Sequence, residues 1–585
     1  MKIVLTVHQF FPEYYSGTEV LTHSVARELV MRGHEVFVFT GYPARELMPD
    51  TRRFDRYEIE GISVYRFHHS FVPMGGQQVV SEIEYNNHLT AGYFRGLLDE
   101  LKPDIVHFFH FSRLGATLID VARELDIPAY YTPTDFWAVC PTSQLLLPDG
   151  RVCSGPSPHG GNCVKHVALL TRWHHYSGIV KYLPDKAMDA FAVVAKAGHG
   201  INFPFRQEIA ALSRRQPFNI SRLNALQGIV SPTQLMTDVL ICNGVNPELI
   251  EQSAFGINVA GFDNFQREYA AGCPITIGYI GTLAPHKGCH VLVDAFNKLT
   301  HSDASLKIYG NPNEFPDYVA GLHATAMHNK AIEFCGTFPN AQIAEVLSGI
   351  DVLVVPSVWY ENTPLVVYSA LAAKCPVIAS NYPGMSEVVR DGWNGLLFEP
   401  NNADALSTCL ARLYSEPTLL QALSGCCAPP KSIAAYVDEL LVLYGRRFQA
   451  SKYPLAGQQG FAAYVLSNRG GHISGWAVVG SNPPKRVALI DTNQEIGSTT
   501  QLLPRPDVRD GLKSSGVKIK AVNFGFTITL ARAMDKATAF LEVEAMGGSR
   551  QRIPYSSLQV GKSFLFEGGV LLGLDQEELP QIINE

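Results

Sequence analysis

Two charged residues, Lys287 and Glu361, each follow an apolar, β-rich run at the point where a buried strand would end. Lys287 lies in a loop of small residues after Thr276–Ile280, and Glu361 lies in a polar loop after Asp351–Pro356. Open α/β sheets bind ligands at the carboxyl ends of their strands. A lysine just before a helix suits a diphosphate, because the free N–H groups and the dipole of a helix N-terminus favour anions. We therefore predict a diphosphate site in these loops.

The elements that position the second loop alternate between strand and helix over residues 351–400. The first strand is followed by a helix that Pro364 can start, since proline lacks only an N–H that a first helical turn leaves free. A second strand, Pro376–Ser380, leads through Pro383 and Gly384 to a new helix that we expect near Ser386. Two helix N-termini would then face one crevice, which again favours a diphosphate.

This segment resembles the nucleotide-binding half of the large retaining glycosyltransferases with the GT-B fold, which carry a Glu-x7-Glu motif here. Glu361 matches the first glutamate, and Ser369 stands where the second would be. The resemblance implies that Glu361 contacts the donor sugar and that the second glutamate's ribose contact is missing. It extends over about residues 1–450 and implies an α/β fold with two Rossmann-like domains facing a cleft.

The resemblance also implies where the rest of the donor binds. Thr282 occupies a position at which the family has arginine, so Lys287 is left with more of the leaving-group charge. Ser16 and Gly17 stand where the family has a Gly-Gly pair in the first strand–helix loop. The implied donor-binding residues are Gly17, Gly281, Thr282, Lys287, Asn311, Thr337, Asn362, Thr363, Pro364, Leu365, Ser369, Gly384 and Met385.

The acceptor side is expected at strand ends in the first half of the chain. One strand carries His107 and His110, and we favour His110 as the cleft residue because it is nearer the strand end. Asp135 follows Thr134, where the family commonly has histidine. The resemblance makes His110, Asp135 and Glu361 the candidate catalytic residues.

The loop after Asp135 contains a group of metal-binding residue types, namely Cys140, Cys153, Cys163 and His166. Three cysteines and a histidine with a Cys-x2-His ending could form a tetrahedral zinc site. The irregular spacing also fits a Gly/Pro-rich surface loop with unrelated thiols. The length of the loop favours a lid or an acceptor-shaping segment. No other metal ion and no cofactor is predicted.

The composition is that of a soluble globular protein, with 585 residues, 46% hydrophobic, 17% charged and a net charge of −7. Nothing in it indicates nucleic-acid binding. Residues 1–10 have the pattern of a strand and not of a signal peptide. We expect a cytoplasmic protein, with the inner face of the plasma membrane as an open location. Aromatic and basic residues over 165–225 fit either peripheral contact with lipid or a packed core.

The domain boundaries are predicted from where the strand–helix alternation begins and stops. A second prediction is that the last helix of the α/β part returns to the first domain. The expected parts are an N-terminal Rossmann-like acceptor domain (1–262), a donor domain (263–431), the returning helix (432–448), a linker (449–460) and a β-sandwich accessory domain (461–580).

The resemblance implies transfer of a sugar from a nucleotide-diphosphate donor to a hydroxyl group, with retention and without a metal ion. We expect a carbohydrate or lipid-linked acceptor and a role in surface polysaccharide or glycolipid synthesis. A GT-B nucleotide-sugar epimerase, a non-catalytic or weakly active sugar-nucleotide-binding protein and a mainly adhesive role of the β-domain remain alternatives. In that domain Trp476 is either a platform for a sugar or a core anchor, and its apolar strand favours the core.

Overall fold

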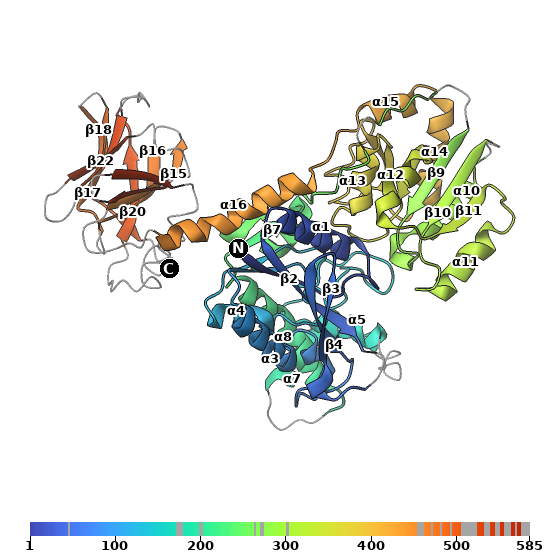
Figure 1. Ribbon diagram of the computed structural model, residues 1–585, viewed down its shortest axis with the longest axis horizontal. Coiled ribbons are helices and arrows are strands. Elements are labelled where there is room, and N and C mark those ends of the chain that lie inside the picture. Colours follow the sequence, from blue (N-terminus) through green and yellow to red (C-terminus); the bar gives the residue numbers. More distant parts are fainter. Residues whose placement is uncertain are drawn as a thin grey trace. The chain divides into compact units, whose positions relative to one another are not determined.

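The structure of the protein is a computed structural model (Figure 1). The chain divides into two compact units, Met1–Glu439 and Leu440–Glu585. The described residues are 1–44, 47–170, 180–197, 203–262, 265–269, 274–299, 303–452, 461–469, 472–479, 483–491, 494–504, 523–531, 539–544, 550–554, 563–567 and 570–574. Most of the predicted linker therefore lies outside the described residues.

The first unit begins with an eight-stranded sheet in the order β3-β4-β2-β1-β5-β6-β7-β8. All neighbouring strands are parallel except β3 and β4. The central strands are apolar and buried, as expected where helices cover both faces of a parallel sheet. The strands are β1 (Lys2–Val7), β2 (Glu35–Pro43), β3 (Phe54–Ile59), β4 (Ile62–His69), β5 (Ile105–Phe108), β6 (Ala129–Tyr131), β7 (Gly228–Ser231) and β8 (Ile250–Gln252).

Helices lie on both faces of this sheet, with α1 on one face and α3 and α4 on the other (Figure 1). The helices are α1 (Gly17–Met31), α2 (Val80–Ile83), α3 (His88–Leu101), α4 (Thr117–Glu124), α5 (Gly161–Leu170), α7 (Asp185–Ala197), α8 (Arg206–Leu223) and α9 (Gln234–Cys242), with short 3-10 turns η1 (Asp50–Arg52) and η2 (Pro247–Leu249). This arrangement places the loops after β1, β5 and β6 at one edge of the sheet, because these strands are parallel.

A second, six-stranded parallel sheet follows in the order β11-β10-β9-β12-β13-β14. Its strands are β9 (Ile275–Ile280), β10 (Ala304–Tyr309), β11 (Ile332–Gly336), β12 (Val352–Val355), β13 (Val377–Ser380) and β14 (Gly395–Phe398). The intervening elements are η3 (Pro285–Lys287), α10 (Cys289–Asn297), α11 (Pro316–Ala326), η4 (Asn340–Gln342), α12 (Ile343–Ser348), α13 (Leu365–Ala372), α14 (Ala403–Ser415) and α15 (Leu419–Gly425). The predicted pair of Rossmann-like sheets is therefore confirmed.

Helix α16 (Ile433–Lys452) begins in the first unit, where its first residues contact the N-terminal sheet. The Tyr436 hydroxyl lies 3.3 Å from Thr132 Oγ1, and Ile257 forms an isolated parallel bridge with Ser432. Arg32 donates to the carbonyl of Ala434 at 2.8 Å. The chain thus returns to the N-terminal sheet after completing the second one. None of the described helices has the length and apolarity to cross a membrane.

The second unit contains two antiparallel sheets, β19-β20-β16-β15-β23-β24 and β18-β17-β21-β22. Residues from both sheets share one hydrophobic core, including Ile473 and Phe526 from one sheet and Val487 and Leu541 from the other. Trp476 is 1% exposed, so it is a core anchor and not a sugar platform. The strands are β15 (Phe461–Arg469), β16 (His472–Val479), β17 (Arg486–Asp491), β18 (Gln494–Thr499), β19 (Leu503–Pro504), β20 (Asn523–Thr529), β21 (Ala539–Glu544), β22 (Arg550–Pro554), β23 (Ser563–Glu567) and β24 (Val570–Leu574).

The helix expected near Ser386 does not form, and residues 383–388 make turns instead. Gly384 has a φ of +85°, outside the right-handed helical region. The carbonyl of Tyr382 accepts hydrogen bonds from the N–H groups of Met385 and Ser386 at 3.2 and 3.0 Å, which closes the turn. The prediction of a second helix N-terminus at this position was therefore wrong. The helix N-termini near the donor loops are those of α10 and α13.

Candidate functional site

The loops after β9 and β12 approach each other so closely that only glycine fits between them. A Cβ atom on Gly288 would lie 1.9 Å from the carbonyl oxygen of Pro356, and Gly288 has a φ of +72°. The N–H of Val358 donates to the carbonyl of His286 at 3.0 Å, which joins the same two loops. Lys287, in the first loop, is thereby held against Glu361 in the second.

Glu361 is buried and is fixed through one of its two carboxylate oxygens. Oε1 accepts hydrogen bonds from Lys287 Nζ at 2.7 Å, Ser357 Oγ at 2.7 Å and Trp359 Nε1 at 2.8 Å. Within the described part of the chain, every hydrogen bond to this carboxylate ends on Oε1. Oε2 therefore keeps its capacity to accept a hydrogen bond.

Lys287 supplies the positive charge of this site. Its side chain is 25% exposed, and its ammonium lies 4.9 Å from the centre of the Trp359 ring. The neighbouring His286 does not add a second cation, because burial and then the charge of Lys287 lower the pKa of His286 to about 4. A compact cation beside a buried carboxylate can therefore bind a phosphate and a sugar hydroxyl side by side.

The start of α13 and the turn after β13 are joined to this site through backbone contacts. Thr363 Oγ1 donates to the carbonyl of Gly384 at 2.7 Å, and a Cβ on Gly384 would lie 2.2 Å from the carbonyl oxygen of Glu361. Pro364 is the N-cap residue of α13, and Leu365 is its first residue. Ser369 bonds back to the carbonyl of Leu365 at 3.2 Å, as serine commonly does inside a helix. Its hydroxyl is thus used within the helix.

Asn362 was predicted to bind the donor, but the structure uses its amide to hold the N-terminal sheet. Its oxygen accepts from Thr233 Oγ1 at 2.7 Å, and its nitrogen donates to the carbonyl of Pro133 at 3.1 Å. Glu387 makes a similar contact, since its carboxylate accepts from the N–H groups of Gln234 and Leu235 at 2.7 and 2.9 Å. Both residues therefore connect the two sheets of the first unit.

The remaining predicted donor residues lie in loops that follow strands or, for Gly17, at the start of α1, and no hydrogen bond among the described residues joins them to one another. Gly281 donates from its backbone to Tyr309, and the carbonyl of Thr282 accepts from the Tyr279 hydroxyl at 2.8 Å. Asn311 bonds within its own loop, Thr337 and Gly17 are exposed, and Met385 is fully buried. A Cβ on Gly17 would meet no atom within 4 Å, so nothing in the structure requires glycine there.

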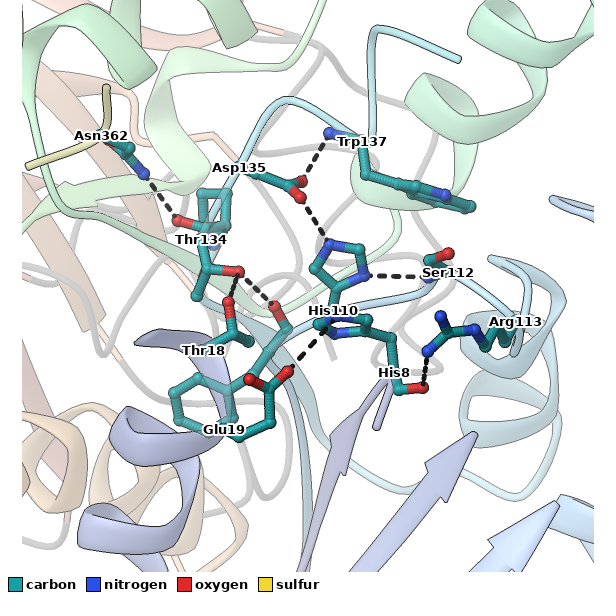
Figure 2. Close-up of polar contacts among 12 residues, drawn as sticks. His8, Thr18, Glu19, His110, Ser112, Arg113, Thr134, Asp135, Trp137 and Asn362 are labelled. Atoms are coloured by element: carbon teal, nitrogen blue, oxygen red, sulfur yellow. Dashed lines mark hydrogen bonds and ion pairs between the residues drawn. The ribbon is translucent and has the colours of Figure 1, made fainter. Parts of the chain in front are cut away.

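His110 uses both of its ring nitrogens inside the protein (Figure 2). The N–H of Ser112 donates to Nδ1 at 3.0 Å, so Nδ1 is the acceptor and Nε2 carries the hydrogen. Nε2 in turn lies 2.8 Å from Asp135 Oδ2. The His110 side chain is only 4% exposed. Both ring nitrogens of His110 are therefore engaged within the protein, and Nε2 orients Asp135.

Asp135 is the more accessible member of this pair, with 25% of its side chain exposed. Its Oδ1 accepts from the N–H of Trp137 at 2.8 Å, and its Oδ2 faces His110. The neighbouring Thr134 hydroxyl accepts from Thr18 Oγ1 at 2.9 Å, which joins the segment to the start of α1. A carboxylate oriented from two sides but still accessible can accept a hydrogen bond from an acceptor hydroxyl.

A second layer of titratable groups behind His110 escaped the sequence prediction. The rings of His8 and His110 are 4.1 Å apart, and His8 Nε2 lies 3.4 Å from Glu19 Oε1 (Figure 2). Burial, followed by the charges of His110 and Arg113, lowers the pKa of His8. Burial raises the pKa of Glu19. The position of His8 directly after the first strand was the signal that could have identified it.

His107, the other histidine of the same segment, belongs to the core. It is fully buried, and its Nε2 lies 2.8 Å from Thr132 Oγ1. Burial lowers its pKa to about 3. His107 therefore packs in the core, whereas His110 lies beside Asp135.

The four residues of the predicted zinc site line one small cavity, together with Asn162 and several apolar side chains. The three cysteines are free thiols. Among the described residues, no three His, Cys, Asp or Glu side chains already stand close enough to hold a metal ion. The cavity is distinct from the carboxylate groups of Asp135 and Glu361, which do not line it.

Two family models match the α/β part of the chain. The model described as glycosyl transferases group 1 matches residues 262–425, and the model described as glycosyltransferase family 4 matches residues 15–154. The first match contains Lys287 and Glu361, and the second contains Asp135. Both charged regions of the site thus lie in stretches that match glycosyltransferases.

Curated relatives and solved structures are also similar to this chain. An uncharacterized glycosyltransferase of Methanocaldococcus jannaschii is 24% identical over 422 residues, which cover 71% of this chain and 90% of that protein. Spore coat protein SA of Bacillus subtilis is 32% identical over 126 residues, 20% of this chain and 33% of that protein. The Anabaena protein Alr3699/HepE in complex with UDP and glucose matches 77% of this chain and 99% of its own, at 15% identity and a TM-score of 0.47. Sucrose-phosphate synthase from Thermosynechococcus elongatus matches 77% of this chain and 98% of its own, at 15% identity and a TM-score of 0.49.

Proposed function

We infer that this GT-B glycosyltransferase moves a sugar from a nucleoside-diphosphate donor to an acceptor hydroxyl with retention of the anomeric configuration, and that it needs no catalytic metal ion. The observation that carries this proposal is the Lys287–Glu361 pair at the ends of β9 and β12. It combines a cation for a leaving phosphate with a carboxylate oxygen left to contact a sugar hydroxyl.

The departure of the diphosphate is the step that needs charge stabilisation most. Lys287 would exchange its contact with Glu361 for the phosphate oxygens, and the start of α10, two residues further on, adds backbone N–H groups. Preorganised donors of this kind, aimed at developing charge, commonly make the greatest single contribution to catalysis. A fixed cation and a helix N-terminus can fill the role that a divalent cation plays in other transferases.

The acceptor hydroxyl would be oriented by Asp135. The His110 ring holds this carboxylate from behind through Nε2, so Asp135 meets the hydroxyl in one orientation. In a retaining transfer on one face of the sugar, the leaving phosphate can accept the hydroxyl proton. Asp135 is then a hydrogen-bond acceptor that positions the nucleophile and needs no large change in protonation.

We propose a carbohydrate or lipid-linked acceptor and a place in surface polysaccharide or glycolipid synthesis. Helix α7 supports contact with an apolar acceptor or lipid surface, because Phe191, Val193 and Val194 are exposed on it. Lys186 and Lys196 lie on the same helix and suit anionic headgroups. The adjoining aromatic stretch, residues 171–179, lies outside the described residues. A cytoplasmic location at the inner face of the membrane would follow from such contact.

The direct test is incubation of the purified protein with a panel of radiolabelled nucleotide sugars in the presence of a chelator. We expect one donor to be slowly hydrolysed to the sugar and the nucleoside diphosphate, and to be transferred when an acceptor is added. NMR of the product should show the same anomeric configuration as the donor. Binding without hydrolysis or transfer would instead support a non-catalytic binding protein, and an epimerised sugar would support an epimerase.

A further inference from the structure

The long loop after Asp135 brings three cysteines and one histidine to a single cavity. Cys140 and Cys153 come from the loop, whereas Cys163 and His166 lie three residues apart in α5. Residues three apart on a helix share a face, which is why both can reach the same cavity. The cavity volume is about 10 Å³, close to the space that one water-sized particle needs.

Cys140 and Cys163 stand on either side of the loop segment that carries Cys153. The segment between them has little regular structure, with one isolated bridge between Leu146 and Val152. Loops of this length without regular structure are uncommon and usually have a function.

A buried, incompletely paired cation lies beside the same thiols. Arg215, from α8, is 2% exposed and donates through Nη2 to the carbonyl of Trp137. Its Nε and Nη1 are buried without a hydrogen-bond partner, and the salt bridges found among the described residues do not include it. The guanidinium lies 4.5 Å from the centre of the Trp137 ring, and burial lowers the pKa of Arg215 while Cys140, Glu84 and Cys163 raise it. Burying a cation is costly unless it is paired, and among the described residues Arg215 has no salt bridge, so a further anionic group nearby would stabilise it.

From this cavity and this cation, we propose that Cys140, Cys153, Cys163 and His166 bind a structural zinc ion whose negative charge is balanced by Arg215. Three thiolates and a neutral imidazole around Zn²⁺ carry a net charge of −1, and the three thiol protons pass to solvent on binding. The four side chains line the cavity, but they do not stand close enough together to hold a metal ion. The thiols must therefore turn towards the centre of the cavity when zinc binds. Four protein ligands would leave the zinc ion no open coordination position. The zinc ion would therefore anchor the loop behind Asp135 and take no part in transfer.

The proposal predicts that the full chain, purified under reducing conditions with zinc and then freed of loose metal, holds one zinc ion per chain by mass spectrometry of the metal. Cys163→Ser and His166→Ala should lose this zinc. His166→Cys should keep it, since four thiolates also form a tetrahedral zinc site. Cys409→Ser, which removes a buried thiol outside the cavity, is the matched control and should keep it as well.

Absence of zinc from the wild-type chain, or equal zinc in wild type and His166→Ala, would overturn the proposal. Arg215→Met tests the charge balance, and its zinc should be removed by a lower concentration of a competing chelator than in wild type. If a variant does not fold, the contrast between His166→Ala and His166→Cys still decides the question, because both alter the same position. Zinc content is measured without donor or acceptor, so this result is independent of the transferase activity.

Discussion

The donor and acceptor regions of the site both pair a carboxylate with a nitrogen base, yet they present opposite members of the pair to a ligand. On the donor side Glu361 is more buried, and Lys287 is the more exposed partner. On the acceptor side His110 is more buried, and Asp135 is the more exposed partner. The donor region therefore offers a cation suited to phosphate, whereas the acceptor region offers an anion suited to a hydroxyl. In each pair, the more exposed member is the one that is more accessible to a ligand.

Removal of the exposed cation should have the largest effect. Lys287→Ala is expected to lower kcat by about 10²- to 10³-fold, the range found when one preorganised donor to a developing charge is lost. Steady-state transfer kinetics at saturating donor would measure it. Lys298→Ala, which removes a surface lysine paired with Asp404, should leave kcat unchanged. Wild-type turnover in Lys287→Ala would remove this residue from the diphosphate site.

The acceptor pair should respond asymmetrically. Asp135→Asn is expected to lower transfer by roughly 10- to 10²-fold, because the amide loses the negative charge that strengthens the hydrogen bond from the hydroxyl. His110→Gln should cost less, since the carboxylate remains and only its support is weakened. The difference between the two variants should appear in the acceptor KM and in the rate of transfer. The rate of donor hydrolysis should be nearly unchanged in both. A larger loss in His110→Gln than in Asp135→Asn would reverse the assignment of their roles.

A smaller effect is expected from the hydrogen bond that orients Glu361. Trp359→Phe keeps an aromatic ring near Lys287 but removes the indole N–H that donates to Oε1. Because two donors to Oε1 remain, the loss of this bond should cost about 1 kcal/mol and lower kcat/KM by roughly fivefold. Trp393→Phe alters an exposed tryptophan and should have no effect. Equal kinetics in both variants would show that this bond does not orient the carboxylate.

His107 should affect the stability of the fold and not the transfer activity. Burial lowers the pKa of His107 in the folded chain to about 3, while the unfolded chain keeps a value near 6.5. As the pH falls below about 6.5, His107 therefore takes up a proton in the unfolded chain but not in the folded chain. At pH 5 this difference lowers the free energy of unfolding by about 2 kcal/mol. His107→Gln should flatten the fall in unfolding free energy between pH 6.5 and 4.5 without changing transfer. His328→Gln, at an exposed position, should follow the wild-type curve.

Strand ends and loop residues could be predicted from sequence because buried strands and small-residue loops leave local patterns. This local information placed Lys287 and Glu361 correctly at the ends of β9 and β12. It failed for the helix near Ser386, where the left-handed backbone of Gly384 turns the chain instead. The sequence pattern of a helix does not reveal the backbone angle of Gly384.

Roles that depend on contacts between distant segments could not be predicted. The amide of Asn362 bonds to Pro133, which lies 229 residues away, so its sequence position beside Glu361 suggested the donor instead. Glu19 contacts His8 only because α1 packs beside the end of β1. The hydrogen bonds of the two His110 ring nitrogens likewise depend on a contact between distant segments, because Nε2 lies beside Asp135 while Nδ1 accepts from Ser112.

The most direct test of this account is the affinity for the donor's nucleoside diphosphate, measured by calorimetry for wild type, Lys287→Ala and Asp135→Asn. The account predicts a loss of affinity of at least tenfold in Lys287→Ala and wild-type affinity in Asp135→Asn, because only the former contacts the phosphates. Equal affinity in all three proteins, or an equal loss in both variants, would contradict the division into a cationic donor region and an anionic acceptor region.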